Sequence, residues 1–362
     1  MKIAFLGDIA LFGRASLTQN PNGRGYFDEV ERLLSEYDYV VGNLESPFSA
    51  KKKKWGAKSA FLCSDVENVK VLKYLHVDAV TLANNHMFDY GCEAFNLTIK
   101  LLEQNGIAWF GANGKEHLME YDGSKLCFSG FCCYSTNPQG CVVHGDYGIN
   151  EFDVRYVEQL INKYAEDGYL NICAVHAGIE HVNYPSLDTI AVAKKLSNKY
   201  PIIYYGHHPH VAQPVLMENA SLIAYSLGNF CFDNVYANPT DKFPLVELSE
   251  DNRSSFILSV TVEHNKIENF EIVPIYIGID RIHVGKGVNK HNLDMFLKNM
   301  LSMEPKEYEN MRDRKRLDWV KMHKSKRDFM WFLRRLRPRY IRLMVTNWQN
   351  ARKYIKEVKS AL

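Results

Sequence analysis

Three histidines lie within four positions of the sequence, at His207, His208 and His210, directly after the apolar run 202–205. Neighbouring imidazoles pack poorly, and protonating several of them together is unfavourable. A metal ion would use several neutral imidazole nitrogens at one point. A surface loop would also tolerate the cluster, so the histidines alone leave both interpretations open.

Polar residues also follow five other apolar runs. These residues are Asp8 after 2–6, Asn43 and Glu45 after 39–42, Asn84, Asn85, His86 and Asp89 after 79–83, His176 and Glu180 after 171–175, and Asn229 after 222–225. One such residue is ordinary turn chemistry. In an open α/β sheet, however, the site forms where the strands end at their carboxyl side. Six strands with such endings, three of them carrying histidine, favour a common site.

The residue types indicate which metal the site would hold. Imidazole, carboxylate and amide oxygen without thiolate fit Mn, Fe, Zn or Ni better than a cysteine-based structural zinc. The set exceeds what one tetrahedral ion uses, whereas two ions about 3.5–4 Å apart with a shared carboxylate would use it. We therefore expect one or two divalent ions, which would polarise a phosphoryl or carbonyl oxygen.

The elements that must position these residues alternate along the first two thirds of the chain. We expect strands at 2–6, 39–42, 79–83, 108–111, 126–132, 171–176, 202–205 and 222–225, and helices at 27–35, 66–74, 94–104, 154–164 and 188–197. This alternation predicts an α/β sheet. The β-rich runs 255–263 and 266–273 flank a turn at residues 263–266 and predict a second, more antiparallel sheet packed on the first.

The C-terminal part has a different composition. From Leu301 onward the chain has 18 Lys/Arg and 7 Asp/Glu, whereas the preceding 300 residues have 26 and 35. Only helices are expected beyond residue 289. The segment 326–345 mixes Phe329, Trp331, Phe332 and Tyr340 with Arg334, Arg335, Arg337, Arg339 and Arg342, and is interrupted by Pro338. It fits a membrane-surface or polyanion-binding helix pair, or a helical cap with solvated arginines. We divide the chain into residues 1–285 and 286–362.

The overall composition excludes several classes of protein. A hydrophobic content of 46% and a charged content of 24% are ordinary for a soluble globular protein. Eight cysteines without C-x-x-C spacing favour free thiols in a reducing compartment. No signal-peptide pattern and no apolar stretch of about 20 residues occurs, so we expect a cytoplasmic protein, at most peripheral to a membrane. The acidic body argues against nucleic acid as a partner.

The segments GDIA, GNLESP, LANNHMFDYG, VHAGIEH, GHHPHVAQP and YSLGNF occur in this order. Together they resemble the CapA family of capsule and poly-γ-glutamate synthesis proteins, over residues 1 to about 235. That family is similar to the calcineurin-like metallophosphoesterases. The resemblance therefore implies a four-layer αββα sandwich of two mixed sheets, here followed by a C-terminal helical extension.

The resemblance also implies roles for individual residues. The implied metal ligands are Asp8, Asn43, Glu45, Asn85, His176, His208 and His210. The implied catalytic residue is His86, which would face the substrate oxyanion, with Asp89 placed to orient it. Glu180, on the loop after His176, is a candidate catalytic general base or a residue that supports a metal ligand. The candidate substrate-binding residues are Lys58, Asn84, His207 and Asn229; a solvated lysine would equally fit Lys58, and a backbone-ordering role would fit Asn229.

Two positions depart from the phosphoesterase pattern. Ala10 stands where a histidine is expected two residues after the first aspartate, and Asn43 stands where an aspartate is expected after Gly42. One metal ion and two therefore both remain open. The resemblance implies a metal-dependent hydrolase acting on a phosphoester or on a linkage of an acidic polymer. The alternative is a non-catalytic, metal-containing protein that binds the polymer, with a membrane-surface or protein partner for the basic tail.

Overall fold

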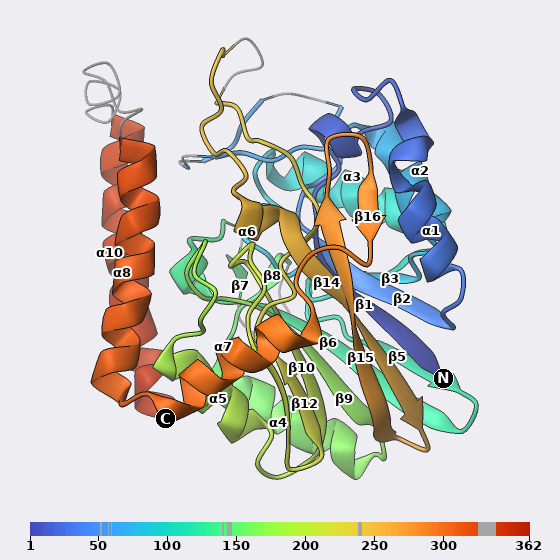
Figure 1. The fold of residues 1–362 in the computed structure, drawn as a ribbon, viewed down its shortest axis with the longest axis vertical. Coiled ribbons are helices and arrows are strands. Elements are labelled where there is room, and N and C mark those ends of the chain that lie inside the picture. Colours follow the sequence, from blue (N-terminus) through green and yellow to red (C-terminus); the bar gives the residue numbers. More distant parts are fainter. Residues whose placement is uncertain are drawn as a thin grey trace.

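The computed structural model describes residues 1–50, 53–56, 58, 60–139, 141–142, 147–237, 241–324 and 338–362. Two mixed sheets pack face to face, with helices on their outer faces (Figure 1). The predicted αββα sandwich of two mixed sheets is therefore confirmed.

The first sheet has eight strands, and the second has six. The first runs in the order β16 (Ile282–Val284), β15 (Lys266–Ile277), β14 (Ser254–Glu263), β1 (Lys2–Ile9), β2 (Tyr39–Leu44), β3 (Ala79–Thr81) and β4 (Ala108–Phe110), with β13 (Asn229–Cys231) also paired to β1. The second runs β11 (Val215–Glu218), β12 (Ser221–Ala224), β10 (Ile202–His207), β9 (Leu170–His176), β6 (Ser124–Cys132) and β5 (His117–Tyr121). A short pair, β7 (Cys141–Val142) and β8 (Ile149–Asn150), lies outside both.

Strand residues alternate between two separate cores because successive side chains point to opposite faces of a sheet. In β1, Ile3 and Phe5 lie in the core between the sheets, whereas Ala4 and Leu6 lie in the core beneath the helices. The apolar runs of the sequence are continuous because both faces of these strands are buried.

Helices cover both outer faces. The helices α1 (Asp28–Leu34), α2 (Val69–Tyr74) and α3 (Gly91–Gln104) contribute to the core on the outer face of the first sheet. The second sheet is covered by α4 (Val154–Glu166) and α5 (Leu187–Leu196). Both begin at side-chain caps: Asp153 accepts from the backbone of Arg155 and Tyr156, and Ser186 accepts from the backbone of Thr189.

One predicted sheet assignment was wrong. The runs 255–263 and 266–273 do form a hairpin, β14–β15, whose turn residues His264 and Asn265 have φ values of 47° and 63°, as two-residue hairpin turns require. But β14 pairs antiparallel with β1 and so extends the first sheet. The second sheet is built instead from strands that we expected in the first, β6, β9, β10 and β12, because a complete α/β series does not reveal where one sheet stops.

The C-terminal part is helical where it is described. It comprises α7 (Lys290–Ser302), α8 (Pro305–Lys324), α10 (Pro338–Glu357) and a final turn, η5 (Lys359–Ala361), with a short α6 (Glu250–Arg253) earlier in the chain. The described part of α10 starts at Pro338, and the preceding residues 325–337 lie outside the described residues, so the interruption at Pro338 stays a prediction. Phe329, Trp331 and Phe332 lie outside the described residues. The division at residue 285 stays a prediction.

Two further expectations concern thiols and membrane spans. Seven cysteines have described side chains; none of them forms a disulfide with another of these seven, and five are buried. Within the described residues, none of the helices combines the length and the apolarity needed to span a bilayer.

Candidate metal centre

Asp8 lies at the carboxyl end of β1, between two other strand ends. The register pairs Asp8 with Asn43 of β2 on one side and with Asn229 of β13 on the other. Gly7 permits this close approach, because a Cβ there would lie 2.0 Å from the carbonyl oxygen of Gly228. The Nδ2 of Asn43 donates to Oδ1 of Asp8 at 2.8 Å. The strand register thus places three of the predicted residues in one row.

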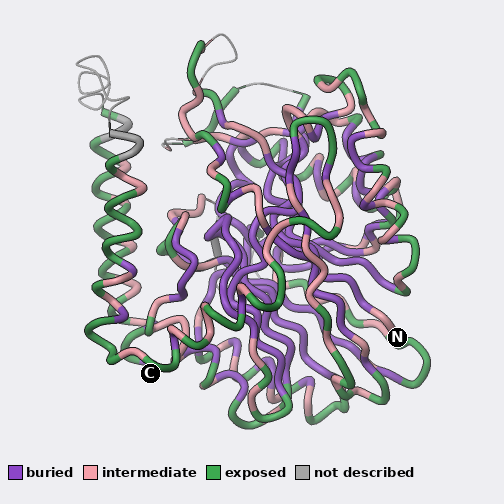
Figure 2. Tube along the Cα trace, viewed as in Figure 1, coloured by how far each residue is buried: buried purple, intermediate pink, exposed green. Residues whose placement is uncertain are grey.

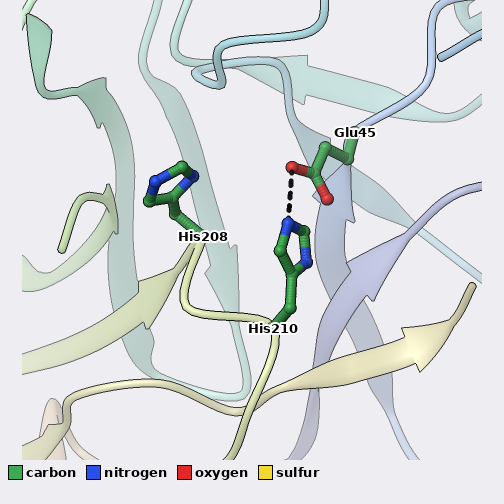
Figure 3. A group of neighbouring side chains, drawn as sticks. All are labelled: Glu45, His208 and His210. Carbon is green, nitrogen blue, oxygen red and sulfur yellow. Dashed lines mark ion pairs between the residues drawn. The ribbon is translucent and has the colours of Figure 1, made fainter. Parts of the chain in front are cut away.

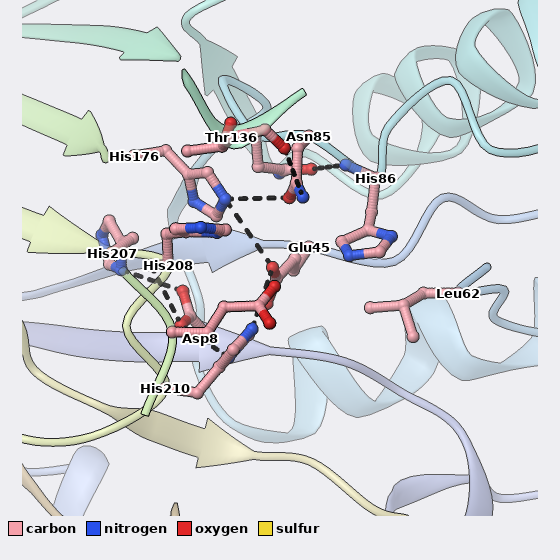
Figure 4. Close-up of polar contacts among 12 residues, drawn as sticks. Asp8, Glu45, Leu62, Asn85, His86, Thr136, His176, His207, His208 and His210 are labelled. Carbon is pink, nitrogen blue, oxygen red and sulfur yellow. Dashed lines mark hydrogen bonds and ion pairs between the residues drawn. The ribbon is translucent and has the colours of Figure 1, made fainter. Parts of the chain in front are cut away.

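The histidines reach the same point from the second sheet. His207 is the register partner of His176, and Gly206 is required beside it because a Cβ would lie 1.9 Å from the carbonyl oxygen of Tyr225. After β10 the backbone turns through φ values of 94° at His208 and 56° at His210. Non-glycine residues rarely adopt such values, and they cluster at functional sites. The carboxyl ends of both sheets therefore meet at one centre (Figure 4).

Asp8 is surrounded by groups from this histidine segment. Its Oδ1 lies 3.2 Å from Nδ1 of His207, and its Oδ2 lies 3.3 Å from Nδ1 of His210. The backbone N–H of His208 donates to Oδ2 at 3.4 Å. Burial alone would raise the pKa of Asp8, but the two imidazoles hold it well below its usual range. Asp8 is thus a buried, ionised carboxylate.

Glu45 and His207 are the two described residues of the centre in which neither polar side-chain atom has a hydrogen-bond partner. Glu45 is 0% exposed, and among the described residues neither of its carboxylate oxygens has a hydrogen-bond partner. Its Oε1 lies 3.7 Å from Nε2 of both His176 and His210. Burial raises the pKa of Glu45 well above its ordinary value. Buried carboxylates without donors are costly unless a cation accompanies them.

Glu45, His208 and His210 form a compact ligand group. One ligand atom from each lies within 4.8 Å of the others (Figure 3). Beside this ligand group, Oδ1 of Asn85 lies 3.0 Å from Nε2 of His176. Imidazole, carboxylate and amide oxygen in this arrangement fit Mn, Fe or Zn. The structure therefore brings the predicted metal ligands together, with Asn43 bonded to Asp8.

The imidazoles of the centre differ in charge: His176 and His208 are neutral, whereas His210 is protonated. Burial lowers the pKa of His176, and it lowers the pKa of His208 to about 4, so both are neutral at pH 7. Burial would also lower the pKa of His210, but Glu45 and Asp8 raise it to about 10. In the metal-free protein, a proton on His210 therefore partly compensates the carboxylates, as a bound cation would.

His86 belongs to a second cluster of polar side chains, together with Asp89 and Lys58. Its Nδ1 lies 2.7 Å from Oδ2 of Asp89, which also accepts from the backbone N–H of Leu62 at 2.7 Å. The ammonium of Lys58 donates to Oδ1 of Asp89 at 2.8 Å and to the carbonyl oxygen of Asn85. Burial and the charge of Lys58 lower the pKa of His86. Asp89 thus fixes a neutral imidazole with its proton on Nδ1.

The four candidate substrate-binding residues are mostly enclosed. Asn84, His207 and Asn229 are at most 1% exposed, and the side chain of Lys58 is 8% exposed. Asn84 donates to Oδ1 of Asn43 at 3.0 Å, and Asn229 donates to the carbonyl oxygen of Asn252 at 3.0 Å. These contacts hold neighbouring site residues in place. That the four candidates contact substrate stays a prediction.

Glu180 lies at the edge of the centre. Its side chain is 47% exposed, and its Oε2 lies 3.8 Å from Nε2 of His181. Partial burial would raise the pKa of Glu180, but His208 and His181 lower it to about 2. Glu180 is therefore an ionised, accessible carboxylate close to the buried histidines.

Three contributors, His181, Asn252 and Trp319, were not predicted from the sequence. His181 has a φ of 64°, and its Nδ1 lies 3.0 Å from Nδ2 of Asn252, which also donates to the carbonyl oxygen of His210 at 2.9 Å. The ring of His181 stacks on Trp319 of α8, with ring centroids 4.2 Å apart. The second histidine of VHAGIEH was a usable signal, whereas Asn252 and Trp319 are too distant in sequence to suggest the contact.

Ala10, which stands in place of the histidine of the phosphoesterase pattern, lies in an apolar cluster. Ala10 is buried against Leu62, Phe232 and Val235, and the ring of Phe232 lies 5.0 Å from that of His210. The position that carries histidine in the phosphoesterase pattern therefore belongs to an apolar wall of the centre.

The fold and the centre define an α/β sandwich with a candidate metal site at the joined carboxyl ends of its sheets. The family model described as bacterial capsule synthesis protein PGA_cap matches residues 2–234, and the chain belongs to this family. The match confirms the family that the sequence motifs indicated. It ends before α7, α8 and α10.

Two relatives agree with this assignment. The chain is 28% identical over 287 residues to the PGA biosynthesis protein CapA of Bacillus subtilis (strain 168), covering 76% of this chain and 72% of the relative. It is 29% identical over 308 residues to the capsule biosynthesis protein CapA of Bacillus anthracis, covering 80% and 73%.

Solved structures with a similar course of the chain include two nucleotidases. The 5'-nucleotidase of Candida albicans SC5314 has a TM-score of 0.44 and 11% identity, covering 90% of this chain and 57% of that chain. The NAD nucleotidase (NadN) of Haemophilus influenzae has a TM-score of 0.42 and 15% identity, covering 87% and 60%. This chain thus spans less than two thirds of either enzyme.

Proposed function

We propose that this chain is a metal-dependent hydrolase of capsule or poly-γ-glutamate biosynthesis, acting on a phosphoester or on a linkage of an acidic polymer. The observation that carries the proposal is Glu45, fully buried, with no hydrogen-bond partner for its carboxylate among the described residues. The imidazoles of His176, His208 and His210 surround it. A divalent cation would compensate this carboxylate and use those nitrogens as ligands.

The proposed ligands come from both sheets. They are Asp8, Glu45, Asn85, His176, His208 and His210, with Asn43 holding Asp8 in position. The chemistry that bound ions supply at such a site is polarisation of a substrate oxygen and activation of water at neutral pH.

His86 is the candidate proton donor and acceptor. Asp89 holds the proton of the neutral ring on Nδ1, which leaves Nε2 free to accept a proton from the attacking water and then to pass that proton to the leaving group. Lys58 keeps Asp89 ionised and in place. Glu180 is accessible and lies close enough to the histidines for its charge to act on them, so it would accept a hydrogen bond from a polar group of the substrate.

A second candidate function is supported by the wall around Ala10. The apolar residues there replace a ligand of the phosphoesterase pattern, so the bound metal would serve a structural role. The protein would then bind the anionic polymer during its assembly without cleaving it.

The experiment compares the wild type with His176→Ala and with His291→Ala, an exposed histidine of α7 that serves as the matched control. Each protein is supplied with Mn, Fe or Zn and tested on p-nitrophenyl phosphoesters and on polyglutamate. We expect turnover by the wild type and the control, and none by His176→Ala. Metal binding without turnover on this panel, together with retention of polyglutamate, would favour the second candidate.

A further inference from the structure

Helix α10 has one face fastened to the body of the protein. The hydroxyl of Tyr134 donates to the carbonyl oxygen of Lys353 at 3.0 Å, and the ammonium of Lys353 pairs with Glu151. Asn350 donates to Oδ1 of Asn137 at 3.2 Å. After the helix, Val358 and Ala361 are buried in the core that α4 and α5 share. These contacts fix the orientation of α10 about its own axis.

The opposite face of α10 is apolar and exposed. We call it the outer face, and it consists of Ile341, Met344, Val345, Trp348 and Ile355. Their exposed fractions are 50%, 58%, 49%, 54% and 59%. Steps of three and four residues from Ile341 to Trp348, continued by the step of seven to Ile355, place them on one stripe. Figure 2 shows the C-terminal helices largely in the colours of intermediate and exposed residues, unlike the buried strands.

Such a stripe on a surface helix usually marks a binding surface, because monomeric proteins rarely expose contiguous apolar patches. In α4, by comparison, the equivalent stripe of Val154, Val157, Leu160 and Ile161 is buried against the second sheet. Helix α10 also has a face that packs on the body of the protein. Its outer face is therefore an additional apolar surface, which the packing of the helix does not use.

Basic residues lie at the border of the outer face, at Arg342 and Lys356, and within it, at Arg352, which follows Trp348 by four residues. Arg342, Arg352 and Lys356 are exposed, and the guanidinium of Arg352 lies 3.7 Å from the centre of the Trp348 ring. The one acidic residue in the sequence of α10, Glu357, is on the fastened side, with a carboxylate oxygen 3.8 Å from the ammonium of Lys353. The outer face is therefore an apolar stripe that includes one arginine, Arg352 stacked on Trp348, and has Arg342 and Lys356 at its border.

We propose that the outer face of α10 binds the surface of a lipid bilayer that contains anionic lipids. An amphipathic helix with Trp and other large apolar side chains on one face and Lys or Arg at its borders binds in the plane of the interface. Anionic headgroups would meet Arg342, Arg352 and Lys356 while the apolar side chains enter the acyl boundary. The inference does not depend on the hydrolase function.

Charge decides between this partner and two others. A second copy of the chain, joined through the same stripe, would bring Arg342, Arg352 and Lys356 against their counterparts with no acidic residue of α10 on that face. A soluble anionic polymer would satisfy the basic residues but leave Trp348 and Ile355 in water. The anionic bilayer supplies both the negative charge and the apolar medium.

Docking would also place the metal centre relative to the membrane. The fastened face of α10 contacts η4 (Tyr134–Thr136), and the carbonyl oxygen of Thr136 accepts from Nδ2 of Asn85 at 3.3 Å. A series of contacts therefore runs from the proposed membrane surface to a candidate metal ligand.

The test is flotation of the full chain with vesicles of phosphatidylcholine alone or with added phosphatidylserine. We expect the wild type to float with the anionic vesicles and to be released by salt. Arg342→Ser with Arg352→Ser should weaken binding by about fivefold for each residue. Met344→Glu with Trp348→Glu should abolish it, and Ile279→Glu, at a residue 83% exposed in another part of the molecule, should have no effect.

The folded state of each variant is checked by circular dichroism and by its metal content, which should match the wild type. Absence of wild-type binding to anionic vesicles at low salt would overturn the proposal. So would equal loss of binding in Ile279→Glu. A dimer in sedimentation velocity that Met344→Glu with Trp348→Glu dissociates would also overturn it, because the outer face would then join two copies of the chain.

Discussion

The metal centre and the outer face of α10 depart from the ordinary distribution of polarity in opposite directions. At the centre, carboxylates and imidazoles are buried at the carboxyl ends of strands. On α10, five large apolar side chains are about half exposed. Each arrangement costs free energy in the isolated chain, and each would be relieved by a partner: a cation at the centre, and an anionic bilayer at the helix. Buried polar groups at the centre and exposed apolar groups on α10 therefore both indicate a binding partner.

The two regions differ in how firmly they are built. Strand register, the close approaches at Gly7 and Gly206, and the φ values of His208 and His210 hold the centre in one geometry. The outer face of α10 needs only a regular helix with one face fastened. Substitutions at the centre should therefore have large effects, and substitutions on the outer face should leave the fold unchanged.

The largest effect is expected from Glu45→Gln. This change removes the central carboxylate but keeps its volume, so the affinity for Mn or Zn should fall by about a hundredfold or more, beyond the 10–100-fold typical of residues that only support a ligand. The melting temperature of the metal-free protein should change little, because removing a buried carboxylate without a hydrogen-bond donor offsets the loss of its ion pair with His210. Calorimetric titration and thermal unfolding measure the two quantities. A large drop in metal-free stability would show that Glu45 has a structural partner instead.

Gly206→Ala tests the close approach beneath the histidines. The new Cβ would meet the carbonyl oxygen of Tyr225, so we expect a loss of about 3 kcal/mol in the free energy of unfolding, at the upper end for overpacking. The control is Gly106→Ala, where φ is +71° but no atom lies within 4 Å. It should cost only about 1 kcal/mol, from the left-handed backbone alone. Equal losses in urea denaturation would contradict the packing argument.

The pH dependence of metal binding tests the charge of His210. Its pKa is raised to about 10 in the metal-free protein, so at neutral pH an ion must displace this proton. The affinity should therefore rise by about tenfold per pH unit from pH 6 towards pH 9. His208, with a pKa lowered to about 4, does not compete in this range. Affinity that is constant over this range, measured in one buffer series, would show that His210 is already neutral.

The smallest effect is expected on the outer face. Val345→Ala should change the free energy of unfolding by no more than about 0.5 kcal/mol, because the side chain is half exposed and alanine favours the helix. The same substitution at the fully buried Val157 of α4 should cost about 2 kcal/mol. The pair compares two apolar helix stripes directly. A comparable cost at Val345 would mean that the outer face packs against part of this chain.

Much of the centre could be predicted because its residues directly follow apolar strands. Polar residues that directly follow an apolar run, from Asp8 to Asn229, can be found in the sequence without knowledge of the fold. The structure brings these residues together. The sheet that each strand joins could not be predicted, because β14 and β6 have similar apolar patterns and differ only in their partners. Strands β5, β11 and β13 were missed because they are short or partly polar.

Other features depend on contacts between distant segments. Asn252 reaches His210 from α6, and Trp319 reaches His181 from α8; neither position has a sequence pattern that indicates a site. The isolation of Glu45 is also invisible in the sequence, since it depends on which donors fail to reach a carboxylate. The basic composition of the tail was clear, whereas the separation of α10 into a fastened and an outer face required its contacts.

Elemental analysis of the purified full chain tests the central claim most directly. After incubation with Mn, Fe or Zn and removal of free ions by gel filtration, we predict one or two tightly held ions per chain in the wild type and in His291→Ala. His208→Ala should retain fewer ions. A wild-type protein that holds none of these metals after loading would contradict the account, because the buried carboxylates and imidazoles would then coexist without the cation that explains them.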